Sequence, residues 1–86
     1  MDKPKPDHCI GIDVGKFALE IATTQSKKTL SIDNEIEQLN EWVNSLEGRH
    51  AVVLEATGSY HLLIAQLLHA AGHQVFVVNG LSLIHI

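Results

Sequence analysis

The sequence has 86 residues, 45% of them hydrophobic, and a formal net charge of -4, which suits one small domain with a modest core. One cysteine excludes an intramolecular disulfide, and no apolar run approaches the roughly 18 residues that a membrane-spanning helix needs. We therefore expect a reducing, cytoplasmic setting without a membrane role. The negative net charge argues against a generic surface for nucleic-acid binding. This objection is weakened because the lysines are all in the first third of the chain, so the charge is distributed unevenly.

The first third of the sequence predicts a short lead-in and three strands. Residues 1–7, MDKPKPD, alternate charge with proline and are expected to be disordered. The three segments that follow read as antiparallel strands: CIGIDV (9–14), KFALEIAT (16–23) and KKTLSID (27–33). Phe17, Leu19 and Ile21 alternate with smaller or polar residues, so we expect all three to point inward. Gly15 and Lys16 predict a hairpin turn.

The rest of the sequence predicts helices alternating with buried strands. Asn34 and Glu37 have the form of a helix cap, and the apolar residues that follow have helical spacing as far as Gly48. A continuous apolar run, AVVLEA (51–56), predicts a strand covered on both faces. A second helix is expected from about Ser59 to Gly72, followed by the strand QVFVVN (74–79). The order β-β-β-α-β-α-β predicts an α/β fold with a mixed sheet.

Two carboxylates end predicted strands and are the candidate catalytic residues. Asp13 lies near the end of the first strand and Glu55 at the end of the fourth, so the two converge if these strands are neighbours. A divalent cation is the simplest remedy for their repulsion, since Mg²⁺ prefers oxygen ligands. Two structural alternatives stay open. Asp13 could accept hydrogen bonds from the amides of the following turn, and Glu55 could cap the second helix.

Residues beside these acids are candidates for contact with a phosphate. Lys16 could approach a phosphate at the metal site, although a lysine in a turn is commonly just solvated. Thr57, Ser59 and Tyr60 belong to the turn before the second helix, whose amides could face an anion. The alternative for this turn is a capped structure with Tyr60 packed on the sheet.

Two segments of the chain resemble a known family. IGIDVGKFALEIA (10–22) and VVLEATGSYHLLIAQLLHAAGHQVFVVN (52–79) resemble the amino-terminal domain of the DEDD insertion-sequence transposases, a class that includes Piv-type DNA invertases and bridge-RNA-guided recombinases. The resemblance implies a RuvC-like, ribonuclease H-like fold, with Asp13 and Glu55 as Mg²⁺ ligands. It also implies DNA strand cleavage and joining in transposition and DNA recombination in the bacterial cytoplasm. Implied partners are DNA, a guide RNA in some members, and further copies of the full-length chain.

The sequence departs from this family after Asn79. Gly80 stands where members usually have proline, and no acidic residue follows Glu55, so the two further aspartates of the family have no counterpart. In the family, a carboxy-terminal domain carries a serine implicated in strand exchange. This domain also has no counterpart in the sequence. We therefore expect a disordered lead-in over 1–7, a partial RuvC-like catalytic domain over 8–79 and an atypical tail over 80–86. Such a truncated fragment is expected to be inactive alone.

Two other functional classes remain open. An actin-like or sugar-kinase-like ATPase also opens with a strand of the GIDVG type and a phosphate-binding hairpin. Two features argue against this class. Lys16 stands where those proteins usually carry a small hydroxyl residue, and the sequence lacks a second Asp-x-Gly phosphate loop. The other class is a non-catalytic remnant or interaction piece, which folds poorly or only with a partner.

Overall fold

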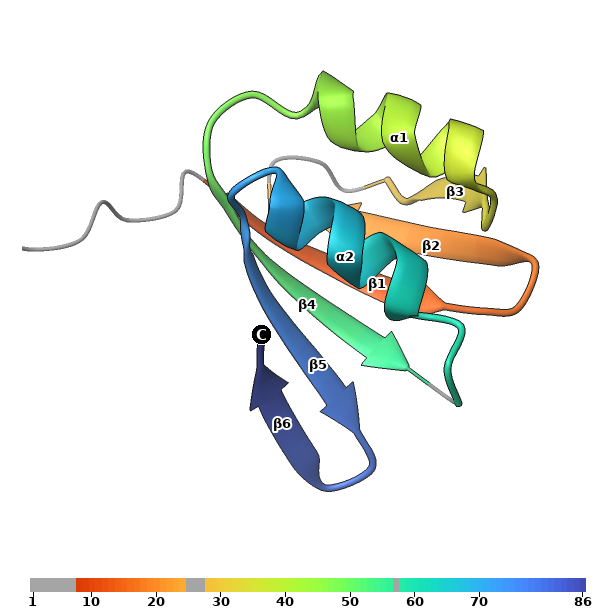
Figure 1. Ribbon diagram of the computed structural model, residues 1–86, viewed down its shortest axis with the longest axis vertical. Helices are drawn as coiled ribbons and strands as arrows, with labels where there is room; N and C mark the ends of the chain where they lie inside the picture. The colour runs from red at the N-terminus through yellow and green to blue at the C-terminus, as the bar shows by residue number, and fades with distance from the viewer. Residues whose placement is uncertain (1–7, 25–27, 57) are drawn as a thin grey trace, which may run out of the picture.

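The computed structural model describes residues 8–24, 28–56 and 58–86 and contains six strands and two helices (Figure 1). In chain order these are β1 (His8–Val14), β2 (Ala18–Thr23), β3 (Leu30–Asp33), α1 (Ile36–Ser45), β4 (His50–Ala56), α2 (Leu62–Ala70), β5 (Gln74–Asn79) and β6 (Ser82–His85). The predicted order is confirmed as far as β5. Strand β6 was not predicted, and the expected lead-in over 1–7 lies outside the described residues.

All six strands form one mixed sheet in the order β3-β2-β1-β4-β5-β6. Strands β1, β4 and β5 are parallel neighbours at its centre, whereas β2, β3 and β6 run antiparallel to the strand beside them. The three opening strands are therefore antiparallel, as predicted. The sheet places the first and fourth strands side by side, which is the condition for the two acids to meet.

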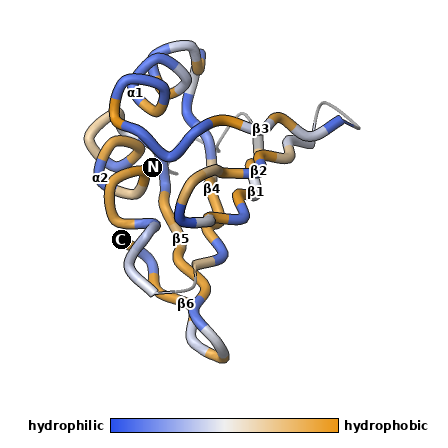
Figure 2. The backbone as a smooth tube through the Cα atoms, turned by 90° about the vertical axis from the view of Figure 1, so that its right-hand side faces the viewer, coloured by the Kyte–Doolittle hydropathy of each residue, from blue (hydrophilic) through white to orange (hydrophobic). Residues whose placement is uncertain are grey.

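Both helices cover the same face of the sheet (Figure 2). The crossovers through α1 and α2 both join parallel strands and both advance in the same direction along the sheet. Right-handed connections of this kind put their helices on one side. Strand β4 is consequently covered on one face only, with Val53 and Glu55 exposed on the other, so the prediction of cover on both faces is wrong for the described residues.

The core lies between the helices and the covered face. It consists of alternate residues of the strands together with the inner faces of the helices. The largest fully buried side chains are Leu19, Ile21, Leu39, Val52, Leu54, Ile64, Leu68 and Val75. Leu19 and Ile21 point inward as predicted, but Phe17 is 77% exposed. The prediction for Phe17 is wrong because β2 begins at Ala18, which leaves Phe17 in the turn.

The start of α1 differs from its predicted form, whereas the end of α2 matches it. The residue that caps α1 is Glu35, which makes no side-chain cap hydrogen bond, so the predicted cap at Asn34 is wrong. Helix α2 ends at Ala70 and is followed by Gly72, which has a positive φ of 93°. The amides of Gly72 and His73 donate to the carbonyls of His69 and Leu68, respectively. This is a Schellman motif. No helix in the described ranges is long and apolar enough to cross a membrane.

Candidate functional site

Asp13 and Glu55 lie side by side on the uncovered face of the sheet. They are register partners in the parallel pair of β1 and β4. Adjacent strands are about 4.8 Å apart, and residues in register project to the same side. Both side chains are exposed, and each lies within two residues of the carboxyl end of its strand. The sheet thus brings together the two acids that the sequence singled out.

A third acid, Glu20, joins this pair and was missed by the sequence patterns. Glu20 of β2 is the antiparallel register partner of Asp13, so Asp13 has a carboxylate on each side. The three acids line one shallow depression of about 330 Å³, together with Gly11, Ile12, Ala22, Thr29 and Val53. Only the hairpin register reveals Glu20. Within the described residues, no three acid, histidine or cysteine side chains are arranged to hold a metal ion.

Neither structural alternative for the two acids is found in the described part of the chain. The turn after β1 is closed by the amide of Gly15, which donates to the carbonyl of Ala18 over 2.9 Å. The residue that caps α2 is His61, and no side chain caps that helix. Asp13 and Glu55 make no side-chain hydrogen bond among the described residues.

The turn between β1 and β2 presents a cation and an aromatic ring at the end of the strand that carries Asp13. Lys16 and Phe17 are both exposed, and the Lys16 Nζ lies 5.2 Å from the centroid of the Phe17 ring. This distance is within the range of a cation–π contact. Lys16 is three residues from Asp13, so the candidate phosphate contact and the acid belong to the same strand end.

The turn before α2 leaves the end of β4 at the same edge of the sheet (Figure 1). Gly58 has a positive φ of 70°, and Ser59 and Tyr60 are exposed. Tyr60 is 43% exposed, so the structure does not pack its whole ring onto the sheet. Thr57, the other candidate in this turn, lies outside the described residues.

Asn34, which the sequence pattern assigns to a helix cap, instead connects these two turns. Its Nδ2 donates to the carbonyl of Gly15 over 3.0 Å and to the carbonyl of Tyr60 over 3.1 Å. Local sequence patterns cannot reveal this role, because the partners are 19 and 26 residues away.

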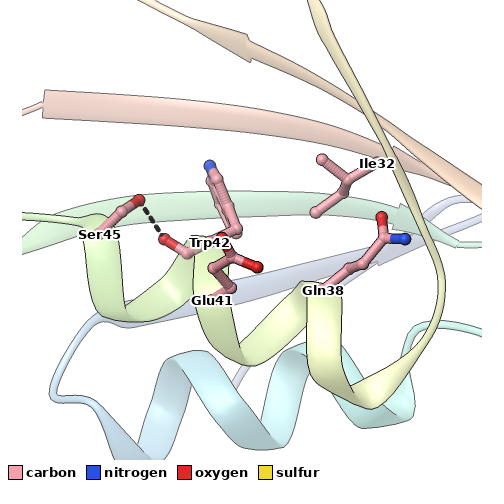
Figure 3. Close-up of a pocket in the computed structure, with 5 residues that line it drawn as sticks. All are labelled: Ile32, Gln38, Glu41, Trp42 and Ser45. Carbon is pink, nitrogen blue, oxygen red and sulfur yellow. Dashed lines mark hydrogen bonds between the residues drawn. The ribbon is translucent and has the colours of Figure 1, made fainter.

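A larger hollow, of about 450 Å³, lies elsewhere, between α1 and β3 (Figure 3). Its lining consists of Ile32, Gln38, Glu41, Trp42 and Ser45. The Ser45 hydroxyl is used locally, since it donates to the carbonyl of Trp42. Among the residues that the structure describes, this hollow has a single carboxylate, that of Glu41. The depression on the uncovered face of the sheet has three, those of Asp13, Glu20 and Glu55, and this part of the sheet is called the acidic face below. We place the site at the acidic face because it supplies more oxygen ligands for a cation.

Two buried histidines lie at the amino ends of the parallel strands β4 and β5, whereas Glu55 lies near the carboxyl end of β4. His50 begins β4 and His73 precedes β5, and the backbone amide of His50 donates to the His73 Nδ1 over 3.1 Å. Burial, and secondarily the neighbouring His50, hold the pKa of His73 below its usual value of 6.5. This pair lies away from the acids.

Comparison with known families identifies the chain. Comparison with curated proteins gives no match. A sequence profile of the DEDD transposases of the IS110 type, described as a transposase family, matches residues 10–86. The mixed sheet with its two helices agrees with the RuvC-like, ribonuclease H-like fold of this family. The profile covers most of the sequence, β6 included, and the chain therefore belongs to the DEDD transposase family.

Proposed function

We propose that this chain contributes Asp13 and Glu55 to a Mg²⁺ site for DNA strand cleavage and joining in transposition. The observation that carries the proposal is the register of β1 and β4, which pairs the two carboxylates on an exposed face. Two carboxylates suit Mg²⁺, which is commonly bound by one or two carboxylates plus water and substrate phosphates. When bound, the ion would offset the charge of a phosphodiester and activate the attacking oxygen.

The residues around the acids support contact with a DNA backbone. Lys16 supplies a positive charge at the end of β1, and Ser59 and Tyr60 supply hydroxyl groups beside the end of β4. Thr57 belongs to the same proposed set by its place in the sequence. Most protein–DNA hydrogen bonds go to phosphate and sugar, which position a strand without reading its sequence. We propose the same role for these residues, with a guide RNA and further copies of the full-length protein as additional partners.

Binding of Mg²⁺ to the two carboxylates can be tested by NMR titration of the 86-residue chain. We expect Mg²⁺ to shift the amide signals of Asp13 and Glu55 with one common dissociation constant. Asp13→Asn should abolish the shift, because it removes the carboxylate between Glu20 and Glu55. Glu55→Gln should weaken binding, because only Glu20 then remains beside Asp13. Glu41→Gln, at an exposed position of α1, is the matched control. Signals that do not respond, or that respond equally in Asp13→Asn, would refute the proposed site.

Strand cleavage is a separate test. The sequence holds two of the four acids of the family, so we expect no Mg²⁺-dependent cleavage of a DNA junction by this 86-residue polypeptide alone. Cleavage that Asp13→Ala abolishes would show that two acids suffice.

Nucleotide binding distinguishes the proposal from the ATPase class. An ATPase of the actin or sugar-kinase type should bind ATP with micromolar affinity in a calorimetric titration, whereas we expect no measurable heat. Micromolar binding of ATP would reject the transposase site in favour of a phosphate-binding hairpin at Gly15 and Lys16. A non-catalytic remnant would bind neither ATP nor Mg²⁺.

A further inference from the structure

The side chain of Asn34 uses its whole donor capacity on two segments of the chain. A carboxamide has two N–H groups on one nitrogen. In this structure the Asn34 Nδ2 donates to the carbonyls of Gly15 and Tyr60, over 3.0 and 3.1 Å. The backbone amide of Asn34 also donates to the carbonyl of Phe17 over 2.8 Å, which fixes Asn34 to the hairpin. Aspartate has no donor for these carbonyls, and serine has only one.

The two segments that Asn34 joins are those that leave the acid-bearing strands. Gly15 comes two residues after Asp13, and Tyr60 comes five residues after Glu55. Each segment contains a glycine, and Gly58 has a positive φ of 70°. Glycine gives a chain more conformational freedom than any other residue. The two turns therefore depend on tertiary contacts for a fixed separation, and the hydrogen bonds of Asn34 supply one.

We propose that Asn34 is a positioning residue: it joins the turns that follow β1 and β4 and so restrains the strand ends further than the ladder that already pairs Asp13 with Glu55. The inference rests on the proposed function, because the geometry that Asn34 fixes matters only if the acids share a ligand. Asn34 itself does not touch that ligand. By fixing the turns, it also sets Lys16 and Tyr60 on one rim of the acidic face.

The test is Mg²⁺ affinity at the acids, measured by NMR in the 86-residue chain under conditions where every variant is fully folded. Asn34→Leu has a similar shape and no donor. We expect it to weaken Mg²⁺ binding about fivefold, the contribution of one typical hydrogen bond. Asn40→Leu, at an exposed position of α1, is the matched control and should keep the original affinity.

A second measurement uses the unaltered chain and does not depend on whether a variant folds. Coupling between two sites is reciprocal, so an ion that benefits from the hydrogen bonds of Asn34 must strengthen them to the same extent. Saturating Mg²⁺ should therefore slow hydrogen exchange of the Asn34 side-chain amide about fivefold.

The outcomes separate the two proposals. If Mg²⁺ shifts neither the Asp13 nor the Glu55 signal in the unaltered chain, the proposed function fails and this inference fails with it. If Mg²⁺ binds to both acids but Asn34→Leu keeps full affinity, the positioning role alone is refuted. Exchange of the Asn34 amide at the same rate with and without Mg²⁺ would refute it equally.

Discussion

Asp13 and Glu55 occupy the same level of two adjacent parallel strands, and their carboxylates share the uncovered face of the sheet. Glu20 stands at that level on the other side of Asp13. Like charges directly opposite each other in a sheet are destabilising. The row of three acids therefore carries a cost in the absence of a cation, and this cost is measurable.

Removal of one charge from this row should stabilise the fold when no divalent ion is present. We expect Asp13→Asn to raise the free energy of unfolding by roughly 0.5 kcal/mol, measured by urea denaturation in EDTA. Asp13 is the central member of the row, so its replacement relieves both neighbouring pairs. Glu41→Gln, at an exposed position in the middle of α1, serves as the control for a change of net charge. A clear loss of stability in Asp13→Asn would favour a structural role for the carboxylate instead.

The same row should make Mg²⁺ a stabilising ligand. Any ligand that binds the folded chain alone raises its stability by mass action. We expect millimolar Mg²⁺ to raise the melting temperature of the unaltered chain, and to leave that of an Asp13→Asn, Glu55→Gln double variant unchanged. An equal rise in both proteins would indicate that the ion acts elsewhere.

Two neighbouring residues of β4 test which face of the sheet is covered. Leu54 is fully buried beneath the helices, whereas Val53 is 41% exposed on the opposite face. Leu54→Ala should reduce the free energy of unfolding by about 2–5 kcal/mol, the usual cost for a buried leucine. Val53→Ala should cost less than about 1 kcal/mol. Similar losses at both positions in urea denaturation would show that a further layer covers the acidic face.

The acidic pair could be anticipated from the sequence because each acid lies near the end of an apolar strand, and a hairpin followed by a crossover allows those strands to be neighbours. The sheet order shows that they are. Glu20 and Asn34 could not be predicted in the same way. The role of Glu20 depends on the exact register of the hairpin, and that of Asn34 on contacts with Gly15 and Tyr60 far along the chain. The alternating pattern also extends to Phe17, one residue before β2 begins, and it therefore predicted wrongly that Phe17 points inward.

Strand β6 gives the sheet an exposed apolar edge. Leu83 and Ile84 are 65% and 55% exposed, and β6 pairs only with β5 among the described strands. Exposed apolar edge strands promote self-association, and a charged residue on such an edge opposes it. We expect Ile84→Lys to reduce concentration-dependent association in analytical ultracentrifugation without loss of thermal stability. Unchanged association in Ile84→Lys would locate the contact away from this edge.

The stability of the fold should decrease as the pH falls below 6.5, because the pKa of His73 is lower in the folded chain than in the unfolded chain. Burial and the neighbouring His50 lower its pKa in the fold, whereas the unfolded chain has the usual value of 6.5. Between the two values the unfolded state binds more protons, so each fall in pH favours unfolding, by at most about 1.4 kcal/mol per pH unit for one proton. The loss ends once the pH is below the pKa of His73 in the fold.

A variant that keeps the acceptor but does not titrate should remove this dependence. Asn at position 73 can place its Oδ1 near the position of the His73 Nδ1, which accepts from the amide of His50. We expect His73→Asn to flatten the change in unfolding free energy between pH 7.5 and 5.5, measured by urea denaturation in buffers of about those values. His69→Asn, at an exposed position of α2, should retain the original slope. If His73→Asn keeps that slope as well, another group binds the proton, and the buried pair contributes only packing.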